Sequence, residues 1–210
     1  MPDLALEHML MNSTHRALIA IDEVGRGALA GPVTVGGVRI SQSCGEVPRG
    51  VDDSKRLSSR RRIELVPQIG DWVEAWSIVH IPAVVIDRIG IMSALALGAR
   101  EVSHNLMGAE AGWILLDGDR DFISPNLDFT RSSQWHVVTQ VKADALCASV
   151  SAASVLAKVA RDDLMINAHD EAPMYGWRRN KGYGAAAHRT AIAQHGSTHW
   201  HRRSWRLLPS

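Results

Sequence analysis

Residues 17–24 read ALIAIDEV and residues 33–40 read VTVGGVRI, and these two stretches decide the fold. Both are rich in aliphatic and β-branched side chains, a composition that favours β-strands. The intervening residues 25–32 include three glycines and one proline, so the connection is a short loop. Because a short loop readily joins neighbouring strands that run in opposite directions, the sequence predicts an antiparallel pair.

Farther along the chain, apolar runs with strand and helix periods alternate. A run that closes on Asp117-Gly118 suits a buried central strand, and Gly90 is expected to break a long helix in two. The pattern predicts strands at 72–81, 113–117 and 135–141, and helices at 82–106, 144–167 and 185–194. Strands first, followed by strands alternating with helices, predict an α/β domain built on a mixed sheet.

The net charge of the chain conceals two oppositely charged parts. The 210 residues are 46% hydrophobic and 21% charged, as in a globular domain, and their formal charge is +1. Residues 1–172 hold 16 Lys or Arg against 22 Asp or Glu, whereas residues 173–210 hold seven against none. Near-neutrality therefore does not exclude a nucleic-acid partner. The lack of an apolar run of about 18 residues excludes a predicted transmembrane helix.

The cysteines and the first residues indicate a cellular compartment. Cys44 and Cys147 form no CxxC pair and are too few for a disulfide framework, which favours a reducing environment. Asp3 and Glu7 stand where a signal peptide carries positive charge. We expect a cytoplasmic protein in which residues 1–16 form a loosely packed lead-in.

Four acidic residues fall at the ends of predicted elements. Asp22 and Glu23 end the first strand, Asp117 ends a later strand, and Asp144 opens the long helix. Ligands of open α/β sheets bind outside the carboxyl ends of the strands, where the fold would gather these acids. Clustered carboxylates resist ionisation unless a cation compensates, and oxygen ligands select Mg²⁺ or Mn²⁺. The set predicts a site for two such ions, about 3.5–4 Å apart, that serves phosphodiester hydrolysis. The alternative for each acid alone is an ordinary turn or helix-capping residue.

The loop that follows the first acids is a candidate ligand-binding loop. Gly25 and Gly27 let a ligand approach the backbone closely, because glycine has no side chain to block it. Arg26 between them offers a planar set of donors to a phosphate. The alternative is a turn between strands with one surface arginine.

Three further basic residues are candidates for phosphate contact. Lys55 opens a basic run whose alternative interpretation is the solvated start of a helix. Lys158 and Arg161 are three residues apart and share a helical face. They would point at a nucleic-acid backbone or pair with Asp162 and Asp163.

The C-terminal segment, residues 173–210, interleaves cations with aromatic rings. These residues are Trp177, Arg178, Arg179, Lys181, Tyr183, Arg189, Trp200, Arg202, Arg203, Trp205 and Arg206. Cations track phosphates and flat rings stack on sugars or bases, so the composition is typical of a nucleic-acid-contacting surface. The alternative is a basic tail wrapped on the acidic body, with the aromatic residues as packing anchors.

Histidines of the same segment do not have the pattern of a zinc site. No cysteine accompanies them, and their spacing matches no standard ligand set. We expect hydrogen-bonded structural roles for His188, His195, His199 and His201.

Blocks in a fixed order carry a resemblance to a known family. They are IAIDEVGRGALAGPV, DDSKRLS, ILLDG, VKADALCASVSAASVLAKVARDDLM, and NKGYGAAAH followed by HGSTHWHRRSW. Together, from about residue 17 to residue 206, they resemble bacterial ribonuclease HII. The resemblance implies an RNase H-like α/β fold, with a five-stranded mixed sheet flanked by helices and a C-terminal helical extension. It divides the chain into a lead-in at 1–16, a catalytic domain at 17–172 and a basic extension at 173–210 that completes the substrate site.

The resemblance also implies roles for individual residues. The metal-binding carboxylates of the family match Asp22, Glu23, Asp117 and Asp144. The loop whose backbone senses the ribose 2′-OH matches Gly25, Arg26 and Gly27. The tyrosine that stacks on the deoxyribose after the ribonucleotide matches Tyr183. Basic family positions, for phosphate contact or support of the site, match Lys55, Lys158 and Arg161.

The chain departs from the family pattern at a few positions. Ala143 stands where glycine is common, and this change is expected to shift the placement of Asp144 slightly. Ala185 replaces a frequent threonine and Trp205 a usual phenylalanine, both as packing changes. The related ribonuclease HIII typically has glutamate at the fourth acid and an extra N-terminal domain, so Asp144 and the short N-terminus favour HII.

The implied activity is that of a metal-dependent endonuclease acting on the RNA strand of RNA–DNA hybrids. Single ribonucleotides in duplex DNA are included, as in ribonucleotide excision repair, with cleavage on their 5′ side to leave a 3′-hydroxyl and a 5′-phosphate. Mg²⁺ or Mn²⁺ is the expected cofactor, and a monomer the expected state. Two alternatives stay open: a non-catalytic hybrid-binding module, and an RNase H-like nuclease that cuts DNA.

Overall fold

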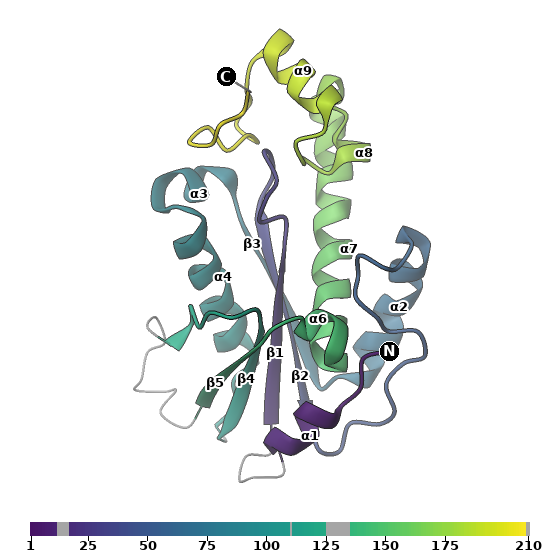
Figure 1. Cartoon of the computed structure of the whole chain (residues 1–210). Coiled ribbons are helices and arrows are strands. Elements are labelled where there is room, and N and C mark those ends of the chain that lie inside the picture. Colours follow the sequence, from purple (N-terminus) through teal and green to yellow (C-terminus); the bar gives the residue numbers. More distant parts are fainter. Residues whose placement is uncertain (12–16, 110, 125–134, 209–210) are drawn as a thin grey trace.

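Five strands form one mixed sheet at the centre of the molecule (Figure 1). The structure is a computed structural model that describes residues 1–11, 17–109, 111–124 and 135–208. The sheet order is β3-β2-β1-β4-β5, and β1, β4 and β5 run parallel while β2 is antiparallel to both of its neighbours. The strands are β1 (Ala17–Val24), β2 (Val33–Ser41), β3 (Ala75–Ile81), β4 (Gly112–Asp117) and β5 (Trp135–Gln140). The predicted antiparallel pair and the mixed sheet are confirmed.

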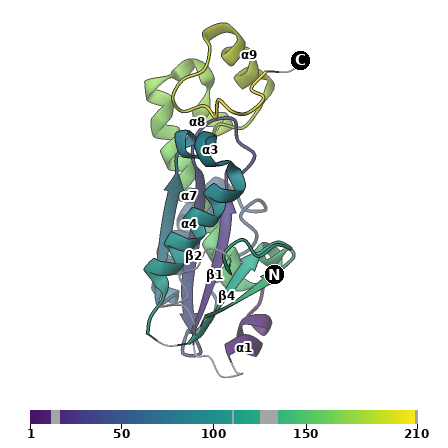
Figure 2. The same cartoon turned by 90° about the vertical axis from the view of Figure 1, so that its left-hand side faces the viewer.

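Helices cover both faces of this sheet. In Figure 1, α3 and α4 lie to the left of the strands and α7 and α2 to the right, and in Figure 2 α4 lies in front of the strands. The helices are α1 (Ala5–Met11), α2 (Ser59–Trp72), α3 (Ala83–Ile89), α4 (Ile91–Leu106), α6 (Ala143–Leu146), α7 (Ala148–Glu171), the 3₁₀ turn η2 (Pro173–Tyr175), α8 (Trp177–Asn180) and α9 (Ala186–His195). Gly90, at φ +79°, separates α3 from α4 as predicted. In the part of the chain described, no helix is long and apolar enough to cross a membrane.

The central strand β1 is buried on both faces. Leu18 and Ala20 belong to the core layer on the α7 side, whereas Ile19 and Ile21 belong to the layer on the α4 side. Successive strand residues point to opposite faces, so an apolar run without polar alternation suits a strand covered on both sides. This double burial explains why the sequence of β1 is so strongly apolar up to its acidic end.

Two consecutive glycines of β2 let the helices approach the sheet. A Cβ atom at Gly36 would lie 2.8 Å from the carbonyl oxygen of Ala153 in α7. A Cβ atom at Gly37 would lie 2.3 Å from Cγ1 of Val102 in α4. Because neighbouring residues face opposite sides, the pair removes one side chain beneath each helix.

The N-terminus is packed, and the expectation of a loose lead-in at 1–16 is wrong for its described part. Helix α1 buries both Glu7 and Met11. The Glu7 carboxylate accepts hydrogen bonds from the amide and the hydroxyl of Ser149, at 3.0 and 2.7 Å, in the first turn of α7. A carboxylate at this place satisfies donors that a helix start leaves unpaired. Residues 12–16 lie outside the described residues.

The long helix predicted at 144–167 is interrupted. Cys147 is extended, at φ −105° and ψ 123°, and it separates the short helix α6 from α7. The amide of Asp3 donates to the carbonyl of Leu146 at 3.0 Å, and the amide of Ala148 donates to the carbonyl of Asp3 at 2.8 Å. The interruption is thus a bridge to the N-terminal segment, a long-range contact that helical periodicity does not report.

The third strand begins later than predicted. Trp72, predicted to begin the strand, is the last residue of α2, Val73 and Glu74 connect the two elements, and β3 starts at Ala75. Leu65, Ile69 and Trp72 are the buried apolar face of α2, at the helical spacing of four and three residues. Ser58 caps this helix by accepting a hydrogen bond from the amide of Arg61 at 3.2 Å.

Candidate active site

Asp22 of β1 and Asp117 of β4 lie at neighbouring positions of two parallel strands. The register pairs Ile21 with Leu116, so the two acids come directly after the last β1–β4 pair. Side chains two residues apart share a sheet face, and Ala20 and Leu115 both belong to the core layer beneath α7. Asp22 and Asp117 therefore lie on the same face of the sheet.

Asp22 is buried beneath α7 with only 6% of its surface exposed. The hydroxyl of Ser154 is its hydrogen-bond partner, and Ser154 Oγ lies 2.9 Å from Ser54 Oγ. Burial, followed by the charge of Glu23, raises the pKa of Asp22 to about 8. Sequence reasoning missed both serines, although each lies in one of the blocks that carry the family resemblance.

Helix α6 brings Asp144 to Asp117. Asp117 Oδ1 accepts hydrogen bonds from the amide of Ala143 at 2.7 Å and from that of Asp144 at 3.5 Å. Burial, and then the charge of Asp144, raise the pKa of Asp117. Ala143, where the resembling family commonly has glycine, is fully buried, and its amide makes the shorter of these contacts.

Glu23, the other acid of β1, is next to Asp22 and so points toward the opposite face. Its Oε1 lies 3.4 Å from Nη1 of Arg26. Burial raises the pKa of Glu23, while the Arg26 guanidinium lowers it and the charge of Asp117 raises it. The charge of Glu23 raises the pKa of Asp22, and the charge of Asp117 raises the pKa of both.

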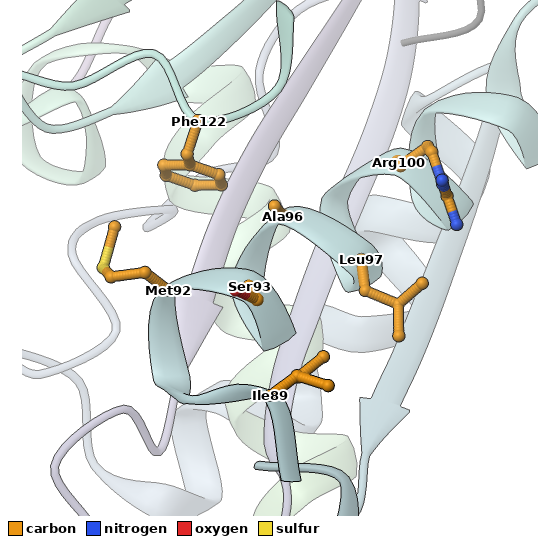
Figure 3. Close-up of a pocket in the computed structure, with 7 residues that line it drawn as sticks. All are labelled: Ile89, Met92, Ser93, Ala96, Leu97, Arg100 and Phe122. Atoms are coloured by element: carbon orange, nitrogen blue, oxygen red, sulfur yellow. The ribbon is translucent and has the colours of Figure 1, made fainter. Parts of the chain in front are cut away.

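A pocket lies near Arg26, on the α4 side of the sheet (Figure 3). Arg26 Nη2 is 3.4 Å from Sδ of Met92, one of the residues that line it. The volume is about 400 Å³, and the lining residues are Ile89, Met92, Ser93, Ala96, Leu97, Arg100 and Phe122. Figure 3 shows Phe122 on the far side of the pocket from Leu97 and Ile89.

Lys55 contributes a cation to the acidic group. Its Nζ lies 2.8 Å from Oδ2 of Asp144, and this hydrogen bond raises the pKa of Lys55. The Lys55 side chain is 76% exposed and that of Asp144 only 8%. The charge of Lys55 also lowers the pKa of Glu23 and of Asp117. The predicted site residue Lys55 therefore lies among the carboxylates.

The chemistry of this donor set fits a hard divalent cation. Acids whose pKa values are raised by burial and by one another are short of positive charge, and oxygen donors suit Mg²⁺ or Mn²⁺. Among the residues that the structure describes, no three His, Cys, Asp or Glu side chains stand close enough to hold an ion as they are.

The loop after β1 depends on a glycine at its first position. Gly25 has φ +82°, and a Cβ atom there would lie 2.0 Å from Nε of Arg161. A Cβ atom at Gly27 would meet nothing within 4 Å. Gly25 is thus required by the loop itself, whereas Gly27 faces open space.

Arg161 is buried, with none of its surface exposed. Its guanidinium donates to the carbonyl oxygens of Pro32 at 2.9 Å, Lys181 at 3.0 Å and Ala30 at 3.2 Å. A side chain so enclosed supports the loop from within. Of the two roles considered for Arg161, phosphate contact does not agree with this burial and support of the site does.

Tyr183 lies near the same arginine and near Lys158. Tyr183 is 37% exposed, and its ring lies 5.3 Å from the Arg161 guanidinium and 6.0 Å from Nζ of Lys158. Lys158 pairs with Asp162 at 2.6 Å, the alternative that the sequence left open. The ring of Tyr183 therefore lies against two cations while part of it stays open to solvent.

The aromatic residues of the C-terminal segment divide into buried and exposed groups. Trp177 is fully buried, stacks on Tyr175 at 5.2 Å between ring centroids and donates to His188 at 3.0 Å. His188 and His201, also buried, lie 3.2 Å apart between their Nε2 atoms. The expectation that Trp177 contacts nucleic acid is wrong, because its ring is a packing anchor of this segment.

Comparisons with known proteins agree on one family. The family model described as Ribonuclease HII matches residues 19–208. Ribonuclease HII of Cereibacter sphaeroides is 40% identical over 207 residues, which cover 98% of this chain and 91% of that protein. Ribonuclease HII of Nitrosomonas europaea is 39% identical over 190 residues, covering 90% and 82%.

Solved structures show the same architecture. Ribonuclease H2 from Pyrococcus horikoshii OT3 superimposes with a TM-score of 0.75 at 25% identity, over 91% of this chain and 94% of that one. Bst-RNase HIII in complex with Mn²⁺ gives a TM-score of 0.72 at 19% identity, over 99% and 71%, and shows the fold alone.

A mixed five-stranded sheet flanked by helices, with acids at the ends of β1 and β4, defines an enzyme of the RNase H-like class. More particularly, the chain belongs to the ribonuclease HII family, whose members are endonucleases that degrade the RNA of RNA–DNA hybrids.

Proposed function

We propose that this enzyme cleaves single ribonucleotides embedded in duplex DNA as well as longer RNA–DNA hybrids. We further propose that Asp22, Glu23, Asp117 and Asp144 form its active site. The observation that carries this proposal is the placement of Asp22 and Asp117 at adjacent register positions, with Asp144 hydrogen-bonded to Asp117 through its amide. Hydrolysis would leave a 3′-hydroxyl and a 5′-phosphate.

The four carboxylates would hold two divalent cations, Mg²⁺ or Mn²⁺. When bound, such ions supply activation of a water nucleophile and stabilisation of the charge on the phosphodiester. The protein's own contribution is to keep the carboxylates in a buried, mutually repelling group that is neutralised by positive charge. Lys55 supplies part of that charge at Asp144 and would be free to reach toward a phosphate as the cations bind.

Recognition of the ribonucleotide is assigned to the loop after β1 and to Tyr183. In the described chain, the amides of Arg26 and Gly27, both exposed residues, have no hydrogen-bond acceptor within the protein, so they are free to bind a ribose hydroxyl, and the buried Gly25 begins the loop that carries them. The exposed ring of Tyr183 supports stacking on the sugar that follows. Together they would select an RNA-to-DNA junction.

The basic C-terminal extension would hold the duplex beside the acidic body. Its exposed cations include Arg178, Arg179, Arg203 and Arg206. A separate positive surface is needed because the carboxylates repel the phosphates that they act on.

The experiment compares three duplexes of one sequence in Mg²⁺ and in Mn²⁺: an RNA–DNA hybrid, a DNA duplex with one ribonucleotide, and an all-DNA duplex. We expect cleavage of the first two, at the 5′ side of the ribonucleotide in the second. Asp22→Asn and Asp117→Asn should each lower the rate by at least about 10³-fold while leaving duplex binding within a few-fold.

Each alternative predicts another result. A non-catalytic hybrid-binding module would bind the hybrid without cutting it, and a DNA nuclease would cut the all-DNA control. Full activity of both asparagine variants would overturn the assignment of the active site.

A further inference from the structure

Arg202 is a fully buried arginine that the proposed function leaves unexplained. Its guanidinium donates to the carbonyl oxygens of Gly25 at 2.6 Å, Arg26 at 2.7 Å and Gly31 at 3.2 Å. These three acceptors belong to the loop after β1, 171 to 177 positions away in the sequence. The ring of Trp205 lies 4.8 Å from the guanidinium and covers it.

Main-chain hydrogen bonds join the same two segments. The amide of Arg202 donates to the carbonyl of Leu29 at 2.9 Å, and the amide of Gly31 donates to the carbonyl of Trp200 at 2.8 Å. Gly182 O accepts from the amides of Leu29 and Ala30. The C-terminal extension is therefore hydrogen-bonded to this loop at several successive residues. In Figure 1 the end of β1 meets the C-terminal coil at this place.

Burying a guanidinium without solvent is costly, and its rigid set of donors must find acceptors. Burial lowers the pKa of Arg202 to about 9, and the nearby charge of Arg161 lowers it further. The carbonyls that satisfy Arg202 are turned inward as a result. A carbonyl and the amide that follows it point in opposite directions across one peptide plane. The inward carbonyls of Gly25 and Arg26 therefore turn the amides of Arg26 and Gly27, both exposed residues, toward solvent, where they have no partner within the described residues.

We infer that Arg202 is a positioning residue for ribonucleotide recognition. By holding the carbonyls of Gly25 and Arg26 inward, it presents the amides of Arg26 and Gly27 to the ribose 2′-OH. The C-terminal extension thereby sets the discrimination between RNA and DNA without its arginine touching the substrate. This inference rests on the proposed function of the loop.

The test measures discrimination in binding rather than activity. All variants carry Asp117→Asn so that no substrate is cut, and fluorescence anisotropy gives Kd for a duplex with one ribonucleotide and for the matched all-DNA duplex. The Kd for the all-DNA duplex divided by the Kd for the ribonucleotide-containing duplex reports recognition of the 2′-OH. We expect Arg202→Lys and Arg202→Ala to lower this ratio about five- to tenfold, toward one, with the all-DNA Kd changed less than about twofold.

Ile192→Ala is the matched control. Ile192 is buried in the same C-terminal core but makes no hydrogen bond to the loop, so its truncation should lower Tm and leave the ratio unchanged. If Arg202→Ala does not fold, Arg202→Lys decides, because it keeps the charge while one ammonium cannot serve three carbonyls in this geometry.

The inference is overturned if a folded Arg202→Lys protein keeps the parent ratio, or if Ile192→Ala loses as much of it. A ratio of one in the Asp117→Asn parent contradicts the proposed recognition itself and removes the basis of the inference. Cleavage of the ribonucleotide-containing duplex by the unmodified enzyme, measured separately, distinguishes these two failures.

Discussion

The ammonium group of Lys55 lies 2.8 Å from Oδ2 of Asp144 and joins the segment before α2 to the short helix α6. Because the lysine side chain is 76% exposed, such a pair contributes only about 0–1 kcal/mol to folding. The position of the pair matters more than its stability, because the ammonium group is hydrogen-bonded to a carboxylate oxygen of Asp144, a candidate metal ligand.

Removing this ammonium should therefore strengthen cation binding. We expect Lys55→Ala to lower the Mn²⁺ concentration at the midpoint of the cation-induced rise in Tm, by about three- to tenfold. Arg60→Ala serves as the control, since Arg60 is 90% exposed and pairs with Glu64 on α2. An unchanged or higher midpoint for Lys55→Ala would show that Lys55 does not compete with the cation.

The raised pKa of Asp22 predicts that this residue lowers the free energy of unfolding of the metal-free protein as the pH rises. A carboxyl with a folded pKa of about 8 against an ordinary 3.8 stabilises the fold below pH 3.8, and this stability is lost as the pH rises through 8. Asp22→Asn should thus gain stability relative to wild type between pH 5 and pH 8 in EDTA, by on the order of 1 kcal/mol or more. Urea unfolding at several pH values tests this, and a constant difference contradicts it.

The two glycines of the loop should differ in what they tolerate. Gly25→Ala places a Cβ atom 2.0 Å from Arg161 Nε at a positive φ, so we expect a loss of about 1–3 kcal/mol in stability. Gly27→Ala meets nothing within 4 Å and should keep the wild-type Tm. Thermal unfolding checks both, and equal losses of Tm would refute the difference. Activity lost in a fully stable Gly27→Ala protein would support substrate contact at that residue.

His201 should make the C-terminal core sensitive to acid. Burial lowers its pKa to about 4 from an ordinary 6.5, so its stabilising effect is present above pH 6.5 and is lost as the pH falls toward 4. His201→Asn should be less stable at pH 7 but should lose less between pH 6.5 and 4. Urea midpoints followed by tryptophan fluorescence test this, and identical pH profiles of the two proteins would exclude the role.

Glu7 is expected to stabilise the junction between α6 and α7. Glu7→Ala removes both hydrogen bonds to Ser149 and should cost about 1–3 kcal/mol, whereas Glu7→Gln keeps one acceptor and should cost less. Met9→Ala, on the exposed side of α1, is the matched control and should stay within about 0.5 kcal/mol of wild type. Denaturant unfolding ranks the three variants, and a Glu7→Ala protein as stable as Met9→Ala would refute the prediction.

Strands and helices with a buried face were predictable because one physical cause, apolar periodicity, marks them in the sequence. This holds for β1, β2 and β4 and for the break at Gly90. The interruption at Cys147 was not predictable, because its cause is a hydrogen-bonded bridge to Asp3, far away along the chain. Trp177 was misassigned for a related reason: composition does not tell an aromatic packing anchor from an aromatic contact surface.

The charges of the chain also separate what the sequence predicts from what the folded structure decides. By itself the sequence determined that acids end the apolar strands and that cations gather after residue 172, since both are facts of order along the chain. Only the tertiary structure decided which of those charges are usable. It buried Arg161 and Arg202 beneath the loop after β1, left Arg203 and Arg206 exposed, and placed Asp22 beside Asp117 through strand register. Burial and register depend on contacts between distant segments, so they exist only once the chain has folded.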